Sequence, residues 1–104
     1  MSRSLAAALL LSYINDVTFD WDARKANANL KKHGVSFEEA STAFSDTLGA
    51  YYPDRSHDDR FILIGYSKKN RLLYVVHAEV TVDFIRIISA RKATSHEKAR
   101  YKAD

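Results

Sequence analysis

The sequence is poor in the residues on which several common kinds of site depend. Its 104 residues include no cysteine, one proline and three unclustered glycines. The lack of cysteine excludes disulfides and thiolate metal sites, and it suits a reducing cytosol. Without a glycine cluster there is no phosphate-cradling loop. The four histidines, at positions 33, 57, 77 and 96, have no metal-ligand spacing, so we expect neither a metal nor a cofactor.

Long apolar runs are also missing. The run Leu5–Leu11 is too short to cross a membrane, and no convincing signal-peptide cleavage site follows it. We therefore expect residues 1–16 to be a helical or disordered N-terminal extension, and we expect no contact with a membrane. Residues 17–104 have the length of a single small domain.

The composition is that of a globular protein, with 46% hydrophobic and 28% charged residues. The charge is uneven along the chain. Residues 1–54 carry five Lys and Arg against seven Asp and Glu, a net charge of −2, whereas residues 55–104 carry eleven against six, a net charge of +5. A basic half is typical of proteins that bind nucleic acid, although on charge alone a solvated charged surface is the favoured explanation.

The pattern of apolar residues predicts the order β-α-α-β-β-β-β-α. The expected helices cover residues 22–33, 36–44 and 94–101, and the expected strands cover residues 17–21, 47–52, 61–66, 72–79 and 83–90. Short connections between consecutive strands favour an antiparallel meander. The sequence thus predicts an α+β domain whose helices cover one face of the sheet and leave the other open.

Capping residues support these helix boundaries. Asp22 is a suitable N-cap for the first helix, and Gly34 a suitable stop. Ser36 with Glu39, and later Thr94 with Glu97, have the spacing of a capping box, in which each side chain bonds the backbone N–H of the other residue.

Two long strings, about fifty residues apart, carry a resemblance to a known family. They are residues 32–40, KHGVSFEEA, and residues 86–94, RIISARKAT. Shorter matches are Phe19–Asp22, Lys25, Asn29, Asp59–Arg60, Gly65, Glu79, Glu97 and Tyr101. Together, over roughly residues 17–101, these strings resemble the BrnT family, the toxins of type II toxin–antitoxin modules.

That resemblance implies a RelE/ParE-like fold with two N-terminal helices packed on one face of an antiparallel sheet and a C-terminal helix. It also implies metal-independent cleavage of RNA in the cytoplasm and neutralisation by a BrnA antitoxin. The antitoxin carries a ribbon-helix-helix part, so operator DNA is contacted only through it. An alternative from another class is a non-catalytic toxin or binding module that acts on a protein target.

RNA cleavage by an internal 2′-hydroxyl requires a base, a cation that stabilises the phosphorane and an acid for the leaving oxygen. The basic half of the chain supplies such groups on expected strands. Our candidate catalytic residues are Arg60, His77, Glu79, Arg86 and Arg91. Our candidate RNA-binding residues are Lys25, Lys32 and Lys92, of which the first two share a helix face.

Strand alternation sorts these candidates by face. His77 and Glu79 lie on one face of their strand. Arg86 points away from Ile85 and Ile87, whereas Arg91 points with them, so the two arginines belong to different faces unless a bulge intervenes.

Each candidate also has a structural explanation. Glu79 could pair with Arg86 or Arg71, and His77 could be a half-buried strand residue. Arg91 could have no role other than to cap a strand end or contact the antitoxin.

Overall fold

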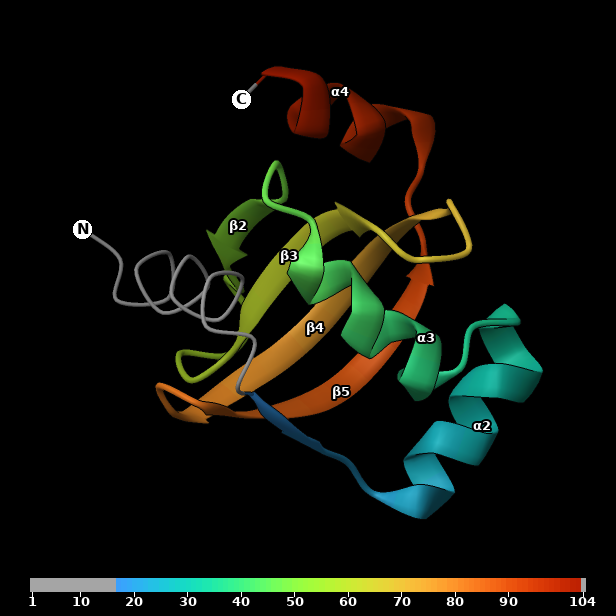
Figure 1. The fold of residues 1–104 in the computed structure, drawn as a ribbon, viewed down its shortest axis with the longest axis vertical. Coiled ribbons are helices and arrows are strands. Elements are labelled where there is room, and N and C mark those ends of the chain that lie inside the picture. The colour runs from blue at the N-terminus through green and yellow to red at the C-terminus, as the bar shows by residue number, and fades with distance from the viewer. Residues whose placement is uncertain (1–16, 104) are drawn as a thin grey trace.

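The computed structural model describes residues 17–103, so the predicted extension at residues 1–16 lies outside the described residues. Figure 1 shows the helices and strands around one curved sheet. The strands are β1 (Thr18–Asp20), β2 (Ala50–Pro53), β3 (Phe61–Tyr66), β4 (Leu72–Thr81) and β5 (Phe84–Lys92). The helices are α2 (Ala23–His33), α3 (Phe37–Thr42), the 3₁₀ turn η1 (Ala43–Ser45) and α4 (Ser95–Ala103). The predicted α+β order is confirmed.

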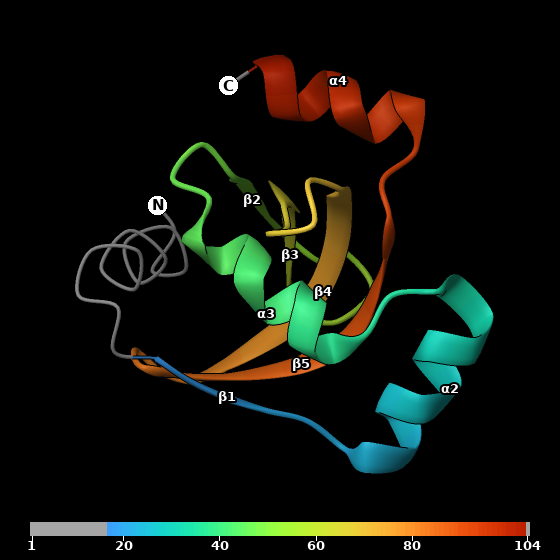
Figure 2. The same cartoon turned by 45° about the vertical axis from the view of Figure 1, so that its right-hand side comes forward.

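The sheet has the strand order β1-β5-β4-β3-β2. Strands β2 to β5 form the predicted antiparallel meander, but β1 pairs with β5 in parallel, with Phe19 opposite Ile85. The prediction of a purely antiparallel sheet is therefore wrong, and the sheet is mixed. The reason is that α2 and α3 return the chain across the sheet, which lets β1 run alongside β5 in the same direction (Figure 2).

One face of the sheet packs under α3 and η1, and we call it the α3 face. Its core joins apolar residues of the helical segment to those of three strands, and Phe37 and Phe44 are its largest helical members. Trp21 packs against this core with its ring edge-to-face on Phe37, at a centroid distance of 6.0 Å. The strand residues of this core are Leu63, Leu73, Val75, Ile85, Ile87 and Ala90.

The opposite face, the α4 face, carries a second and smaller core made by Ala50, Ile62 and Ile64. Tyr101 of α4 packs against it, and its hydroxyl donates a 2.8 Å hydrogen bond to Asp46. This face is therefore covered in part by α4 and is less open than the sequence predicts. Further along it lie Tyr52, Leu72, Tyr74 and Val76.

The two predicted capping boxes differ in outcome. Thr94 and Glu97 form a complete box, because each side chain accepts a hydrogen bond from the backbone N–H of the other. Ser36 caps α3 by accepting from the N–H of Glu39, but the Glu39 carboxylate turns away and binds Arg71 and Ser67 instead. A nearby guanidinium is a stronger partner for a buried carboxylate than a helix N–H. The box of Ser36 and Glu39 is therefore only half formed.

A bulge divides β5 into two halves. Val76 pairs with Ser89 but His77 pairs with Ile87, so Ile88 is an extra residue in β5. Asn29 of α2 supports the strand just beyond the bulge, where β1 has ended. Its side chain donates to the carbonyl of Ala90 at 2.8 Å and accepts from the N–H of the same residue at 3.1 Å. The Asn29 amide thereby replaces the missing strand partner.

Candidate functional site

The bulge in β5 decides where two candidate catalytic arginines point. Before it, Arg86 pairs with Ala78, and beyond it Arg91 pairs with Tyr74. Ala78 and Tyr74 are four residues apart on β4 and therefore lie on the same face. Simple alternation places the two arginines on opposite faces, but the extra residue Ile88 reverses the alternation once. Arg86 and Arg91 consequently share the α4 face.

Arg91 is held in a fixed orientation at the end of β5. Its guanidinium lies over the ring of Tyr74, with 3.9 Å between the guanidinium carbon and the ring centroid. Two further bonds of 2.8 Å join its Nη1 and Nη2 to the two carboxylate oxygens of Glu97. Glu97 keeps the pKa of Arg91 above its ordinary value, and Arg91 lowers the pKa of Glu97. The guanidinium is thus pre-positioned, with a third of the side chain still exposed.

Arg86 is less constrained. Its Nη2 lies 2.6 Å from a carboxylate oxygen of Asp20, which is its direct partner in the parallel β1–β5 pair. About half of the side chain is exposed, 49%, so its remaining N–H groups face solvent. Arg86 therefore remains able to bind an anionic group on the α4 face.

A pocket of about 460 Å³ opens on the α4 face, next to Arg91. Its aromatic and apolar walls are Tyr52, Ile62 and Tyr74, and Arg100 of α4 closes one side. The Arg100 guanidinium carbon lies 4.6 Å from the centre of the Tyr52 ring. The loop between β2 and β3 provides the remaining wall, which consists of Pro53, Asp54, Arg55 and Ser56.

The candidates His77 and Glu79 belong to the other side of the sheet. His77 is fully buried on the α3 face, where its ring packs edge-to-face on Phe44 and Tyr51 and at a tilt on Phe61, at centroid distances of 4.8 to 6.3 Å. Burial lowers the pKa of His77 to about 4, so the imidazole is neutral at pH 7. Glu79 lies close enough to Tyr51 for its charge to help raise the pKa of the Tyr51 hydroxyl. The sheet separates both residues from Arg86 and Arg91.

The burial of His77 predicts acid sensitivity. Unfolding restores the ordinary pKa of His77, near 6.5. Between pH 6.5 and pH 4, His77 is therefore protonated in the unfolded chain and neutral in the folded chain. Stability is therefore lost as the pH falls through this window, by ~2 kcal/mol between pH 7 and pH 5. Urea unfolding at both pH values should show this loss in the wild type but not in His77→Leu, which has no proton to bind.

The paired carboxylates do not contribute to the change in stability between pH 7 and pH 5. Arg71 and Arg91 lower the pKa of Glu39 and of Glu97 below the usual value of 4.5, so both carboxylates stay ionised at pH 5. Equal losses of stability in wild type and His77→Leu between pH 7 and pH 5 would contradict the assignment of this effect to His77.

The remaining candidates are dispersed. Arg60 lies at the end of the β2–β3 loop, with a half-buried side chain and a backbone carbonyl bonded to Asp54 N–H. Lys25 and Lys32 are exposed on α2, whose Ala26 packs against the α3 core. Lys92 ends β5 opposite Leu73, on the side away from Arg91. The structure thus gathers Arg86 and Arg91 on one face and does not bring the lysines to it.

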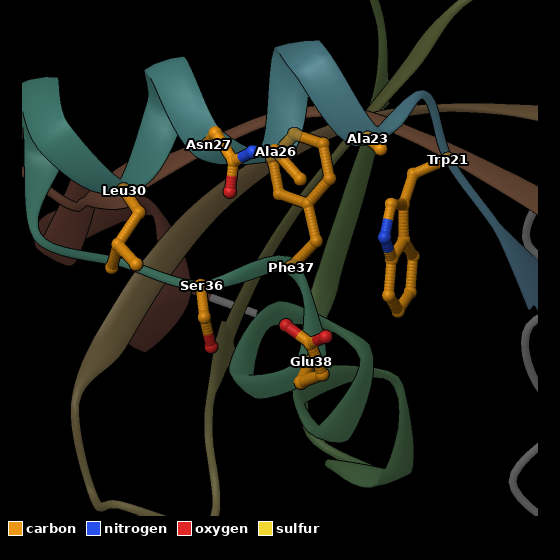
Figure 3. Close-up of a pocket in the computed structure, with 8 residues that line it drawn as sticks. All are labelled: Trp21, Ala23, Ala26, Asn27, Leu30, Ser36, Phe37 and Glu38. Carbon is orange, nitrogen blue, oxygen red and sulfur yellow. The ribbon is translucent and has the colours of Figure 1, made fainter.

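A second hollow, of about 200 Å³, lies between α2 and α3. Figure 3 shows Trp21, Leu30 and Phe37 around it, with Glu38 at its mouth. Its lining contains one carboxylate and no Lys or Arg. The hollow is therefore a poor site for a polyanion, whereas the α4-face pocket has two arginines in its lining.

The sequence interpretation missed the residues that surround Arg91. Tyr52, Tyr74 and Arg100 come from two strands and a helix, and no short motif joins them. The alternation of Tyr74 with Leu73 and Val75 was the available signal, because it directs Tyr74 away from the main core. Glu97 was recognised as a capping residue, and its second role as the partner of Arg91 depends on how α4 docks.

Among residues 17–103, no three His, Asp or Glu side chains gather in a way that suits a metal ion. Nor does any helix in this described part have the length and apolar character needed to cross a bilayer.

Comparison with known proteins gives a family. Residues 21–97 match the family model described as the ribonuclease toxin BrnT of type II toxin–antitoxin systems. The crystal structure of the ribonuclease toxin BrnT of Brucella abortus is similar, with 25% sequence identity and a TM-score of 0.62 over 76% of this chain and 99% of that one. A search of curated proteins finds no match. The chain therefore belongs to the BrnT family of ribonuclease toxins of type II toxin–antitoxin systems.

Proposed function

We propose that this protein is an endoribonuclease toxin that cleaves RNA on the α4 face without a metal ion. The observation that carries the proposal is the shared face of Arg86 and Arg91, which the bulge at Ile88 produces. Each guanidinium is held by one carboxylate and is still partly exposed, so both can donate hydrogen bonds to the phosphates of an RNA backbone. Membership of a ribonuclease toxin family supports the same activity.

In the proposed reaction water takes the proton of an internal 2′-hydroxyl, and the 2′-oxygen attacks the adjacent phosphorus. The bond from phosphorus to the 5′-oxygen breaks, and the leaving oxygen takes a proton from water. Negative charge builds up on the phosphorane oxygens in the transition state. Arg86 and Arg91 stabilise that charge, and the pairing with Glu97 keeps Arg91 in place before RNA binds. His77 acts as a core residue in this proposal, because its imidazole is fully buried on the opposite face.

We further propose a BrnA-type ribbon-helix-helix antitoxin as the partner, with toxin and antitoxin in the cytoplasm. The antitoxin covers part of the α4 face or the Arg86–Lys92 region and so blocks access of RNA to the arginines. Operator DNA is contacted only through the antitoxin. Full ribonuclease activity in a stoichiometric complex would contradict this placement.

The test is induced expression followed by primer extension on cellular RNA. We expect growth arrest, discrete new RNA ends and recovery when the antitoxin is co-expressed. Purified toxin should retain its activity in excess EDTA and leave 2′,3′-cyclic or 3′-phosphate ends, because the 2′-oxygen is the nucleophile. Loss of activity in EDTA, or 3′-hydroxyl ends, would contradict this mechanism. Growth arrest with intact RNA would favour a protein target instead.

A further inference from the structure

We infer that the pocket between α4 and the β2–β3 loop binds one unstacked base of single-stranded RNA, next to the phosphate at Arg91. This inference rests on the proposed function and adds a base-binding subsite to it. The pocket floor is formed by Tyr52, Ile62 and Tyr74, and its volume of about 460 Å³ is in the range of pockets that hold small ligands.

The aromatic side chains suit a base. Each of the two tyrosine rings already has a guanidinium over it, Arg91 over Tyr74 and Arg100 over Tyr52. Stacking of splayed bases on aromatic rings and on guanidinium planes is the usual way in which proteins hold single-stranded RNA. The pocket is therefore lined by two aromatic rings and by the Arg100 guanidinium, which are flat groups on which a base can stack, and one of the rings contacts Arg91.

The charges at the rim suit the adjoining phosphates. Within the described part of the chain, Arg55 and Arg100 form no salt bridge, whereas Arg86 and Arg91 each have a carboxylate partner. Both Arg55 and Arg100 are exposed and line the pocket. Two unneutralised guanidinium groups at the mouth of an aromatic pocket provide contacts for the phosphates on either side of the bound base.

The wall of the pocket also carries groups that can read the edge of a base. The Asp54 carboxylate accepts a 2.9 Å bond from the N–H of Ser56, which fixes the carboxylate within the loop. Its other oxygen lies 4.0 Å from Nδ1 of His57 and has room to accept from an exocyclic amino group, and the Ser56 hydroxyl serves as donor or acceptor. The subsite therefore favours bases that present an amino group, such as cytosine or adenine, over uracil.

Contacts within the chain hold the pocket in shape. Glu97 fixes the start of α4 through Arg91, and Tyr101 fixes its later part through the 2.8 Å bond to Asp46. Arg100 precedes Tyr101 and is thereby kept over Tyr52. A preformed site loses little conformational entropy when it binds a flexible strand.

Binding of a short single-stranded RNA with 2′-O-methyl groups tests this subsite separately from cleavage, because the strand lacks the nucleophile. We expect Tyr52→Leu to weaken binding by about tenfold to a hundredfold, the usual contribution of one stacked base, with little change in its salt dependence. Tyr52→Phe keeps the ring and should bind like the wild type. Arg55→Ala and Arg100→Ala should each lower the slope of log affinity against log salt by about 0.7.

A series of strands, each with one abasic position, locates the base. One position should lose affinity in the wild type, and the same abasic strand should lose nothing further in Tyr52→Leu. The control variant is Arg24→Ala, which removes an exposed charge from α2 and should leave binding unchanged. All variants should show a thermal unfolding transition close to that of the wild type. Wild-type RNA binding by Tyr52→Phe would show that the aromatic ring, and not the hydroxyl, is needed.

Several outcomes would overturn the subsite. They are wild-type binding in Tyr52→Leu and Arg100→Ala, equal effects of every abasic position, or no detectable binding of the strand to the wild type. Weaker antitoxin binding with unchanged RNA binding would assign the pocket to the antitoxin. Cleavage of RNA by these variants at the wild-type rate would leave the proposed function intact, whereas a wild type that cuts no RNA in cells would defeat the function itself.

Discussion

Replacing Arg86 or Arg91 with alanine is expected to slow RNA cleavage roughly a hundredfold, the effect of losing ~3 kcal/mol of transition-state stabilisation. The reason is that both guanidinium groups face the same side of the sheet, where the charge of the phosphorane develops in the proposed reaction. Single-turnover cleavage of a defined RNA measures the effect. Lysine at either position should recover only part of the rate, because the two-pronged geometry of guanidinium on phosphate is lost.

Glu97 provides a sharper test of Arg91. Its carboxylate holds the Arg91 guanidinium through two bonds and also caps α4. Glu97→Gln should therefore lower the cleavage rate, and Arg91→Ala combined with Glu97→Gln should be no slower than Arg91→Ala alone. Circular dichroism must show that Arg86→Ala and Arg91→Ala are folded. Wild-type cleavage rates in these two variants would then remove Arg86 and Arg91 from the mechanism.

Arg71→Ala is expected to lower the free energy of unfolding by ~3 kcal/mol, because it leaves a buried carboxylate without its partner. The Glu39 side chain is only 2% exposed and bonds Arg71 through both of its oxygens. Ser67 donates a third bond, of 2.7 Å, to the same carboxylate. This cluster joins α3 to the β3–β4 hairpin, and Arg71 extends it by a 3.0 Å bond to the carbonyl of Gly34.

Urea unfolding of matched variants measures this contribution. Arg71→Ala and Arg24→Ala remove the same charge, but Arg24 lies exposed on α2, so its loss should cost much less. The double variant Arg71→Met with Glu39→Leu removes both charges and should be more stable than Arg71→Ala. Equal stabilities of Arg71→Ala and Arg24→Ala would show that the buried pair does not hold α3 to the hairpin.

Much of the fold was predictable because its signals are local. Asp22 accepts bonds from the N–H groups of Arg24 and Lys25, and Gly34 ends α2 with a φ of 72°, as the capping pattern indicates. The strand Phe61–Tyr66 has the predicted bounds. The predicted likeness to RelE/ParE toxins stays a prediction.

The site was less predictable because it depends on a bulge and on long-range contacts, which the alternation of residues along a strand does not reveal. One extra residue at Ile88 reverses the face of Arg91, and nothing in the string Ile85–Ala90 indicates where a bulge falls. The capping spacing of Ser36 and Glu39 was visible, but the preference of Glu39 for Arg71 arises only when the hairpin folds against α3. Tyr52, Tyr74 and Arg100 meet only in the assembled sheet.

The bulge at Ile88 also has a consequence for how this strand tolerates change. Removal of one residue between Arg86 and Arg91 would take out the extra residue and leave Arg91 opposite Tyr74 on the α4 face, whereas regular pairing at the present length would move Arg91 to the α3 face. Three hydrogen bonds join Asn29 to Val35 and Ala90, and they hold the second half of β5 in its present register. We therefore expect β5 to tolerate loss of its extra residue better than a one-residue shift of register, which would move every later side chain to the opposite face.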